Sequence, residues 1–381
     1  MSDAAEEGPE SGAANAQLRD ALCLSLVSGV GPSTTRALLE RFGTPGKALD
    51  ASGSALRDVP GVGAKLAERI VAARRELDVD DELAECARVG ARVMAKGTDG
   101  YPPPLLDIPD PPSLLYMLGT YEPVDQLAVA IVGSRRCTPY GLRIAERLAA
   151  SLARVGITVV SGLARGIDAA AHRGALKAGG RTIGVLANGL SQIYPPEHEQ
   201  LAVEVAYTGA VVSEMPIRQG PLAGLFPQRN RVISGLSLGV IVVEATARSG
   251  SLSTAKHAME QNREVFAVPG PVDSLASQGC HRLIRDGARL VETVDDVLEE
   301  LGPLARVVKA SPGSPGVRHP AELSLSDLER SILARLGDTP VGIDELVAAS
   351  RLGTSQVVAT LSVLEMRRLV RRSPGPCFSR C

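Results

Sequence analysis

The stretch from residue 127 to residue 302 alternates short apolar runs with amphipathic segments, and this alternation limits the possible folds most strongly. Strands are expected at 127–132, 157–160, 182–186, 210–212, 240–243 and 265–268. Helices are expected at 140–154, 168–178, 201–207, 251–261 and 278–287. Strands made almost entirely of Val, Ile, Leu and Ala are typical of a sheet buried on both faces. We therefore predict an α/β fold with a Rossmann-like, doubly wound, mostly parallel sheet.

The segment before this domain indicates short helices separated by glycine turns. Two similar units, at 26–42 and 59–73, each place a Gly-x-Gly turn before an amphipathic helix. This pattern resembles a tandem helix-hairpin-helix module, in which the turn can present backbone N–H groups to a DNA phosphate. Gly61, Gly63 and Lys65 are the candidate contacts in the second unit. The alternative is an all-α packing domain whose turns touch no DNA.

The last segment predicts a winged-helix domain. Helices are expected from Ser326 to Leu336, at 342–349 and at 354–367, followed by a basic two-stranded wing at 369–378. Such a fold places its third helix in a DNA groove. Arg367 and Arg371 are candidate secondary contacts to duplex DNA, although this small fold also serves as a protein-interaction module.

These elements divide the chain into six parts. A disordered tail at 1–17 precedes the helical domain at 18–100. A proline-rich connector with an edge strand at 114–118 occupies 101–126, since six prolines in the eleven residues 102–112 exclude a helix. The Rossmann-like domain at 127–302, a linker at 303–322 and the winged helix at 323–381 complete the division.

Composition restricts the function. The chain has 41 Lys and Arg against 43 Asp and Glu, so a nucleic-acid site would need locally gathered basic residues. The six cysteines form no C-x-x-C pair, and no metal or cofactor is expected. The N-terminus does not have the pattern of a signal peptide, and no apolar run has membrane-spanning length. We therefore expect a cytoplasmic protein without a membrane partner.

Three groups of loops carry the chemistry of the central domain. The first strand ends in Gly133, Ser134 and Arg135. The second ends in the run 161–168, where Gly162 and Gly166 can present N–H groups to phosphate. Asp168 is expected to cap the following helix, and His172 within that helix is expected to be structural. The first loop lacks the G-x-G-x-x-G pattern, which argues against a dinucleotide enzyme.

The third group of loops lies later in the chain. The run 226–236 places Arg229 and Arg231 on either side of Asn230, at an expected loop-to-helix junction where both arginines could hold successive phosphates. Ser249, Gly250 and Ser251 open a further helix whose N-terminus suits an anion. Several such loops at the carboxyl edge of one sheet favour a polymer backbone over a single phosphate, because each phosphate needs its own donors.

The motifs Ile131-Val-Gly-Ser-Arg135, Ser161-Gly-Leu-Ala-Arg-Gly-Ile-Asp168, Phe226-Pro-x-Arg-Asn-Arg231 and Ser249-Gly-Ser-Leu252 together resemble the DNA-processing protein A family, DprA or Smf. The resemblance covers nearly all of the central domain. It implies a homodimer without enzymatic activity that binds single-stranded DNA and loads the RecA recombinase during natural transformation or recombination. The candidate DNA contacts are Gly133, Ser134, Arg135, Ser161, Gly162, Arg165, Gly166, Gln228, Arg229, Asn230, Arg231, Ser249, Gly250 and Ser251.

Two other functions remain open from the sequence. A Rossmann-like phosphoribohydrolase could use Glu214 and Glu244 as an acid–base pair, although the Pro-Gly-Gly-x-Gly-Thr run of those enzymes is missing. A duplex-DNA repair or regulatory protein could instead use the two terminal domains.

Overall fold

The structure is a computed structural model that describes residues 9–305 and 326–380, apart from 338–339, 351, 367–368, 374 and 376. Arg367, the first eight residues of the predicted tail and most of the predicted linker lie outside the described residues. Within the described part, no helix is both long and apolar enough to cross a membrane.

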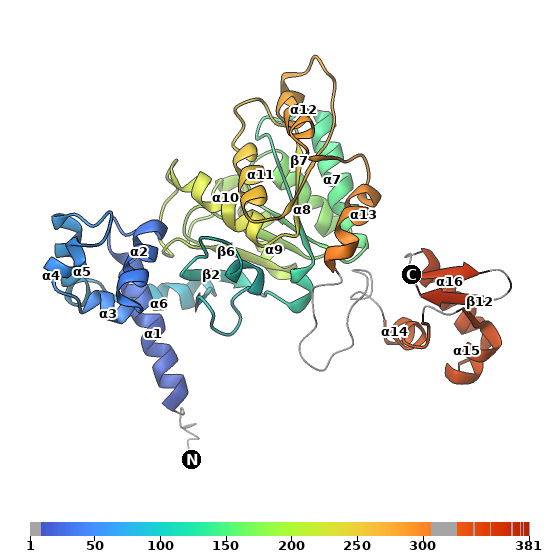
Figure 1. Cartoon of the computed structure of the whole chain (residues 1–381), viewed down its shortest axis with the longest axis horizontal. Helices are drawn as coiled ribbons and strands as arrows, with labels where there is room; N and C mark the ends of the chain where they lie inside the picture. The colour runs from blue at the N-terminus through green and yellow to red at the C-terminus, as the bar shows by residue number, and fades with distance from the viewer. Residues whose placement is uncertain are drawn as a thin grey trace.

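Within residues 9–305, nine strands form one sheet in the order β1-β2-β6-β5-β4-β3-β7-β8-β9 (Figure 1). The strands from β6 to β9 in this order pair in parallel, whereas β1 and β2 are antiparallel. This topology confirms the mostly parallel, doubly wound sheet. The strands are β1 Arg92–Ala95, β2 Leu114–Gly119, β3 Ala128–Gly133, β4 Thr158–Ser161, β5 Thr182–Val185, β6 Ala210–Ser213, β7 Gly239–Val243, β8 Glu264–Ala267 and β9 Arg289–Leu290.

Helices cover both faces of the sheet, as the continuous apolar strands predict. One face packs against α7 (Pro139–Arg154), α8 (Ile167–Lys177), α9 (Glu199–Thr208) and α13 (Val294–Ala305). The other face packs against α10 (Leu225–Gly235), α11 (Ser251–Glu260) and α12 (Gln278–Arg285). Alternate residues of each strand supply the two cores: Val129 and Ile131 face one, Ala130 and Val132 the other.

The strand predicted at 114–118 is present as β2, but the prediction that it lies at an edge of the sheet is wrong. β2 pairs with β6 on one side and with β1 on the other, so it lies inside the sheet. β1 falls within the stretch predicted to be purely helical. Its four residues show no regular alternation of exposure, and so short a run gives little periodic signal in the sequence.

The N-terminal region is helical apart from β1. Its helices are α1 (Pro9–Leu26), α2 (Pro32–Phe42), α3 (Pro45–Leu49), α4 (Gly53–Arg57), α5 (Ala64–Glu76) and α6 (Val79–Val89). α1 begins inside the stretch predicted to be disordered. Glycine is required in both predicted turns, because Gly29 has a φ of 98° and Gly61 a φ of 85°. α1 and α6 pack against β1 and β2, which attaches this region to the sheet.

The C-terminal unit has the predicted winged-helix arrangement. Ser326 caps α14 (Asp327–Leu333), and the Ser326 N–H donates to Glu329 Oε2 at 2.7 Å in a capping box. α15 (Ile343–Ser350) and α16 (Thr354–Met366) follow. β11 (Val370–Ser373) and β12 (Cys377–Arg380) form the wing, and β10 (Val341–Gly342) pairs with β12.

Candidate nucleic-acid interface

A cavity of about 980 Å³ opens at the carboxyl ends of the parallel strands. It lies where the chain order reverses, because β3 is flanked by β4 on one side and by β7 on the other. Such a reversal point is the usual ligand site of an open α/β sheet. The cavity is lined by Val132, Gly133, Ser134, Arg135, Arg136, Ala164, Asp168, Tyr194, Pro221, Ala223, Phe226, Pro227, Arg229, Asn230, Ile233, Thr246, Ser249, Gly250, Ser251, Ser253 and Thr254.

The loop after β3 supplies the exposed positive charge. Arg135 is exposed, and its guanidinium carbon lies 4.7 Å from the centre of the Phe226 ring. Its planar group therefore stacks on an aromatic face while keeping N–H donors for an anion. Gly133 permits the close approach of the strand ends, since a Cβ there would collide with the Val243 carbonyl oxygen. The Ser134 N–H donates to the carbonyl oxygen of Glu244 at 2.8 Å and fixes the loop.

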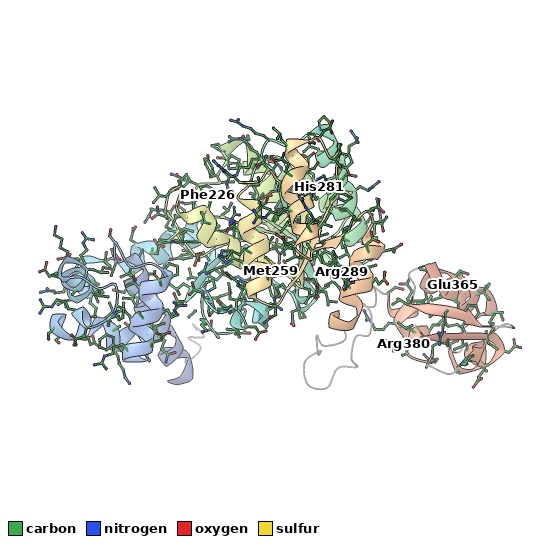
Figure 2. The ribbon with its side chains drawn as sticks, turned by 45° about the horizontal axis from the view of Figure 1, so that its top comes forward. Phe226, Met259, His281, Arg289, Glu365 and Arg380 are labelled. Carbon is green, nitrogen blue, oxygen red and sulfur yellow. The ribbon has the colours of Figure 1, made fainter. Side chains whose placement is uncertain are left out.

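Two aromatic side chains line the cavity beside Arg135. The rings of Tyr194 and Phe226 meet edge to face with centroids 5.9 Å apart, and Phe226 lies at the start of α10 (Figure 2). Sequence reasoning did not place either residue in the site. Phe226 belonged to the arginine motif, and the scarcity of aromatics was the one signal that could have singled it out. Their position allows stacking with unpaired bases.

The turn before α11 also lines the cavity. Ser249, Gly250 and Ser251 all line the cavity, with the two hydroxyls 2.8 Å apart. The Asn230 side-chain amide donates to the Gly250 carbonyl oxygen at 3.3 Å and ties this turn to α10. Thr246, Ser253 and Thr254 add hydroxyls that the sequence did not single out. The N-terminus of α11 therefore faces the cavity with hydroxyl and backbone donors, an arrangement suited to phosphate.

Arg229 reaches the cavity from below and is buried. One nitrogen of its guanidinium donates to the Gly162 carbonyl oxygen at 2.8 Å and also to the Val185 carbonyl oxygen. Burial lowers the pKa of Arg229 to about 10, although the neighbouring Asp168 opposes this shift. Burial likewise raises the pKa of Asp168 above its ordinary value, against the influence of Arg229. Arg229 thus braces the floor of the cavity and keeps positive charge beneath it.

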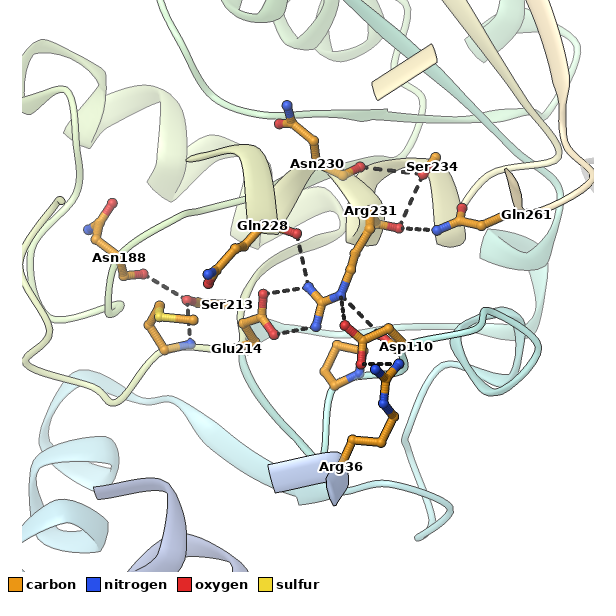
Figure 3. Close-up of polar contacts among 12 residues, drawn as sticks. Arg36, Asp110, Asn188, Ser213, Glu214, Gln228, Asn230, Arg231, Ser234 and Gln261 are labelled. Carbon is orange, nitrogen blue, oxygen red and sulfur yellow. Dashed lines mark hydrogen bonds and ion pairs between the residues drawn. The ribbon is translucent and has the colours of Figure 1, made fainter. Parts of the chain in front are cut away.

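Arg231 points elsewhere. Its guanidinium forms two bonds with the Glu214 carboxylate, at 2.6 and 2.7 Å, and an ion pair with Asp110 (Figure 3). The segment 225–235 is helical throughout, whereas the sequence predicted a loop-to-helix junction. Residues two apart on a helix point in nearly opposite directions, so Arg229 and Arg231 cannot hold successive phosphates together. Gln228 is exposed, does not line the cavity, and accepts a bond from Arg231 through its carbonyl oxygen.

The loop 161–168 shapes the site from within. Ser161 is fully buried and donates to the Ile131 carbonyl oxygen at 2.6 Å, so it is not brought to the cavity. Gly166, with a φ of 77°, turns against the backbone of Ser134. Gly162 and Arg165 line a narrow crevice beside the cavity, where Arg165 pairs with Glu197.

Asp168 lies in the first turn of α8 rather than at its N-cap, which is Gly166. Its carboxylate accepts from the N–H groups of Gly162 and Ala164, so it organises the loop and not the helix terminus. His172 is structural as expected, because it is buried and bonds Thr182 Oγ1 at 2.7 Å.

The two glutamates considered as an acid–base pair are both engaged away from the cavity. Glu214 is bound by Arg231. The carboxylate of Glu244 accepts from the Thr138 N–H at 2.8 Å and from the Thr138 hydroxyl at the start of α7. Neither carboxylate lines the cavity, and Glu244 anchors the arginine loop to the neighbouring helix.

The secondary candidates lie far from this cavity in the chain. Gly61 occupies its turn, Gly63 is the N-cap of α5, and Lys65 is exposed in the first turn of that helix. Arg371 is exposed on β11 and bonds Ser379 Oγ at 3.1 Å.

Comparison with known families identifies the chain. The profile of the family described as "DNA recombination-mediator protein A" matches residues 92–302, which hold the whole cavity. The chain belongs to the DprA family. The profile "DprA winged helix domain" matches residues 317–376, and "SAM-like Helix-hairpin-helix tandem" matches residues 23–76. The three predicted domain types are therefore confirmed.

Individual DprA relatives agree with this assignment. "Protein Smf" of Synechocystis is 36% identical over 396 residues, covering 96% of this chain and 100% of the relative. The X-ray structure of DprA from Streptococcus pneumoniae, 37% identical, superposes with a TM-score of 0.62 over 74% of this chain and 95% of that one. A Helicobacter pylori DprA structure, titled for its single-stranded DNA binding mode, is 32% identical, with a TM-score of 0.50 over 55% of this chain and 95% of that one.

Proposed function

We propose that this DprA protein binds single-stranded DNA in the cavity at the carboxyl edge of its sheet and delivers it to the RecA recombinase. The observation that carries the proposal is the placement of Arg135 on Phe226 in a cavity that the hydroxyl-rich turn 249–251 also lines. A cation, an aromatic platform and backbone donors within one cavity match the needs of a strand whose bases are unpaired.

The proposed DNA contacts are those candidates that line the cavity or its crevice. Arg135 and the α11 N-terminus hold phosphates, Phe226 and Tyr194 stack with bases, and Arg229 supplies charge from below. Duplex DNA fits this arrangement less well, because paired bases are stacked on one another and cannot reach the aromatic rings. Gly61, Gly63, Lys65, Arg367 and Arg371 stay proposed contacts to duplex DNA through the terminal domains.

Fluorescence anisotropy with a labelled oligo-dT and a labelled duplex tests this proposal. Arg135→Ala is expected to weaken single-strand binding by about 1.5–3 kcal/mol, the range for a lost charged hydrogen bond. Arg88→Ala, which removes an exposed partner of Glu85 on α6, is the matched control and is expected to bind like wild type. Equal oligo-dT affinity of wild type and Arg135→Ala, or no binding of oligo-dT at all, would contradict the proposed site.

The delivery step needs a separate experiment. RecA ATPase activity is measured on single-stranded DNA that is already coated with single-strand-binding protein. We expect this DprA to stimulate RecA on the coated DNA and Arg135→Ala to lose the effect. The family description as a recombination mediator supports this step. Equal RecA activity with and without the protein would contradict it.

We further propose that the protein acts as a cytoplasmic homodimer and not as an enzyme. Sedimentation at micromolar concentration tests the dimer. The engagement of Glu214 by Arg231 and of Glu244 by Thr138 leaves neither carboxylate free for acid–base work. Incubation with nucleoside monophosphates should therefore release no free base, and release would revive the phosphoribohydrolase alternative.

A further inference from the structure

A second basic surface lies on the α7–α8 face of the sheet, apart from the cavity. Arg143, Arg147 and Arg154 on α7 and Lys177 on α8 line a groove of about 290 Å³, together with Glu146. None of these five residues lines the cavity described above. The groove therefore forms a separate feature, which we call the α7 groove.

Helical geometry places the three arginines on one stripe. They stand at intervals of four and seven residues, which return to the same side of an α-helix. The stripe runs along α7 for about 16 Å, given a rise of about 1.5 Å per residue. The two helices approach closely here, because a Cβ on Gly174 of α8 would collide with the backbone of Glu146. The arginines thus project from a rigid pair of packed helices.

The three arginines of the α7 groove are not neutralised by carboxylates in the described part of the chain. Within the described residues, Glu146 pairs with Lys177, and Arg147 donates only to the Glu292 carbonyl oxygen at 3.3 Å. No carboxylate in that part of the chain forms an ion pair with Arg143, Arg147 or Arg154.

Some exposed arginines elsewhere in the described part of the chain are paired with carboxylates. Arg88 pairs with Glu85, Arg218 with Asp81 and Arg282 with Asp286. In a chain whose net charge is −2, a row of unpaired arginines marks a surface suited to a polyanion.

The α7 groove follows directly after the cavity along the chain and extends away from it. Arg135 and Arg136 line the cavity, and α7 begins three residues later, at Pro139. Glu244 holds that end of α7 against the carboxyl edge of the sheet through Thr138. The stripe therefore starts about one helical turn beyond the cavity rim and leads away from it along the covered face of the sheet, where Figure 1 shows α7 and α8.

We propose that the α7 groove binds the phosphate backbone of the same single strand after it leaves the cavity. This inference rests on the proposed function. A stripe about 16 Å long spans more than one phosphate, since successive phosphates of a stacked strand rise by about 3.4 Å. The groove holds cations without aromatic residues, so it would contact the backbone and not the bases. It lengthens the DNA site without adding sequence preference.

Oligonucleotide length separates the two surfaces. Anisotropy is measured with dT oligomers of about 6 and about 25 nucleotides, because a short oligomer fills the cavity and only a long one reaches α7. The triple variant Arg143→Ala, Arg147→Ala, Arg154→Ala should bind the long oligomer about tenfold more weakly. Its affinity for the short oligomer should be unchanged, which also reports that the cavity is folded.

A charge-preserving variant and the salt dependence complete the test. The triple lysine variant should keep the long-oligomer affinity, because phosphate attraction needs charge more than the guanidinium fork. In the alanine variant, the slope of log K against log salt should become shallower by about 0.7 for every phosphate that the arginines no longer neutralise.

Each outcome decides between the two proposals. If the alanine variant kept wild-type affinity and salt slope for the long oligomer, the groove proposal would be overturned and the cavity proposal would stand. The same result is expected if the groove binds an acidic protein and not DNA. Failure of the wild type to bind either oligomer would overturn the proposed function and the groove together.

Discussion

The Arg229 guanidinium lies beneath the cavity floor and donates to the carbonyl oxygen of Gly162 at 2.8 Å. The same glycine donates its N–H to Asp168 Oδ2 at 3.1 Å. One residue without a side chain thereby joins a buried cation to a buried carboxylate. This relationship gives the loop after β4 its shape, because both charged groups occupy the space where a Cβ would stand.

Gly162→Ala should therefore deform the cavity. The added Cβ would stand 2.6 Å from Asp168 Oδ2 and closer still to the Arg229 guanidinium, so the buried pair must move. We expect a loss of about 1–3 kcal/mol in the free energy of unfolding, as for other overpacked cores, together with weaker binding of oligo-dT. Urea denaturation and anisotropy measure the two effects.

Gly53→Ala provides the control for that substitution. Gly53 begins α4, and nothing lies within 4 Å of the position that its Cβ would take. Its stability and DNA binding should match wild type. A Gly162→Ala protein as stable and as tightly binding as Gly53→Ala would show that the loop tolerates the side chain.

The sequence located the sheet, most of its helices and the loops at its carboxyl edge, because continuous apolar strands and glycine turns leave direct signals. It could not assign the arginines of 226–236 correctly. Whether Arg229 or Arg231 faces the cavity depends on the orientation of α10, and the sequence predicted a loop-to-helix junction where α10 already starts at Leu225. The partner of Arg231, Glu214, lies 17 residues away and only the fold brings the two together.

The contrast between Arg231 and Arg135 can be measured. Arg231→Ala leaves the Glu214 carboxylate buried without its cation, and removing one partner of a buried pair costs about 3–5 kcal/mol of stability. Arg135 is exposed, so Arg135→Ala should change the thermal midpoint little while weakening DNA binding. A stable Arg231→Ala protein that has lost DNA affinity would instead restore the direct phosphate contact predicted from the sequence.

Phe226 was missed as a site residue because the motif that contains it was interpreted through its arginines and Asn230 alone. Its ring is half-buried beneath Arg135. Phe226→Ala should weaken binding of oligo-dT by about 1–3 kcal/mol, the cost of losing one stacked base. Phe226→Tyr keeps the aromatic face and should bind nearly as wild type. Equal affinity of the alanine and tyrosine variants in anisotropy would exclude stacking on this ring.

His172 makes the protein sensitive to acid. Burial lowers its pKa from 6.5 to about 3, with His198 and Arg229 adding to the shift. The folded state therefore keeps the ring neutral while the unfolded chain takes up a proton below about pH 6.5. The stability that comes from the neutral ring is complete above that pH and is lost as the pH falls toward 3, at about 1.4 kcal/mol per pH unit.

Urea denaturation at pH 7 and at pH 5 tests this dependence through the difference between the two free energies. His172→Gln removes the titrating ring and should lose much less stability between the two pH values than wild type. Thr182→Val removes the hydrogen-bond partner but keeps the buried ring, so its pH dependence should persist even if its stability falls. Because burial is the largest cause of the shift, a pH dependence that disappears in Thr182→Val would assign the effect to the hydrogen bond instead.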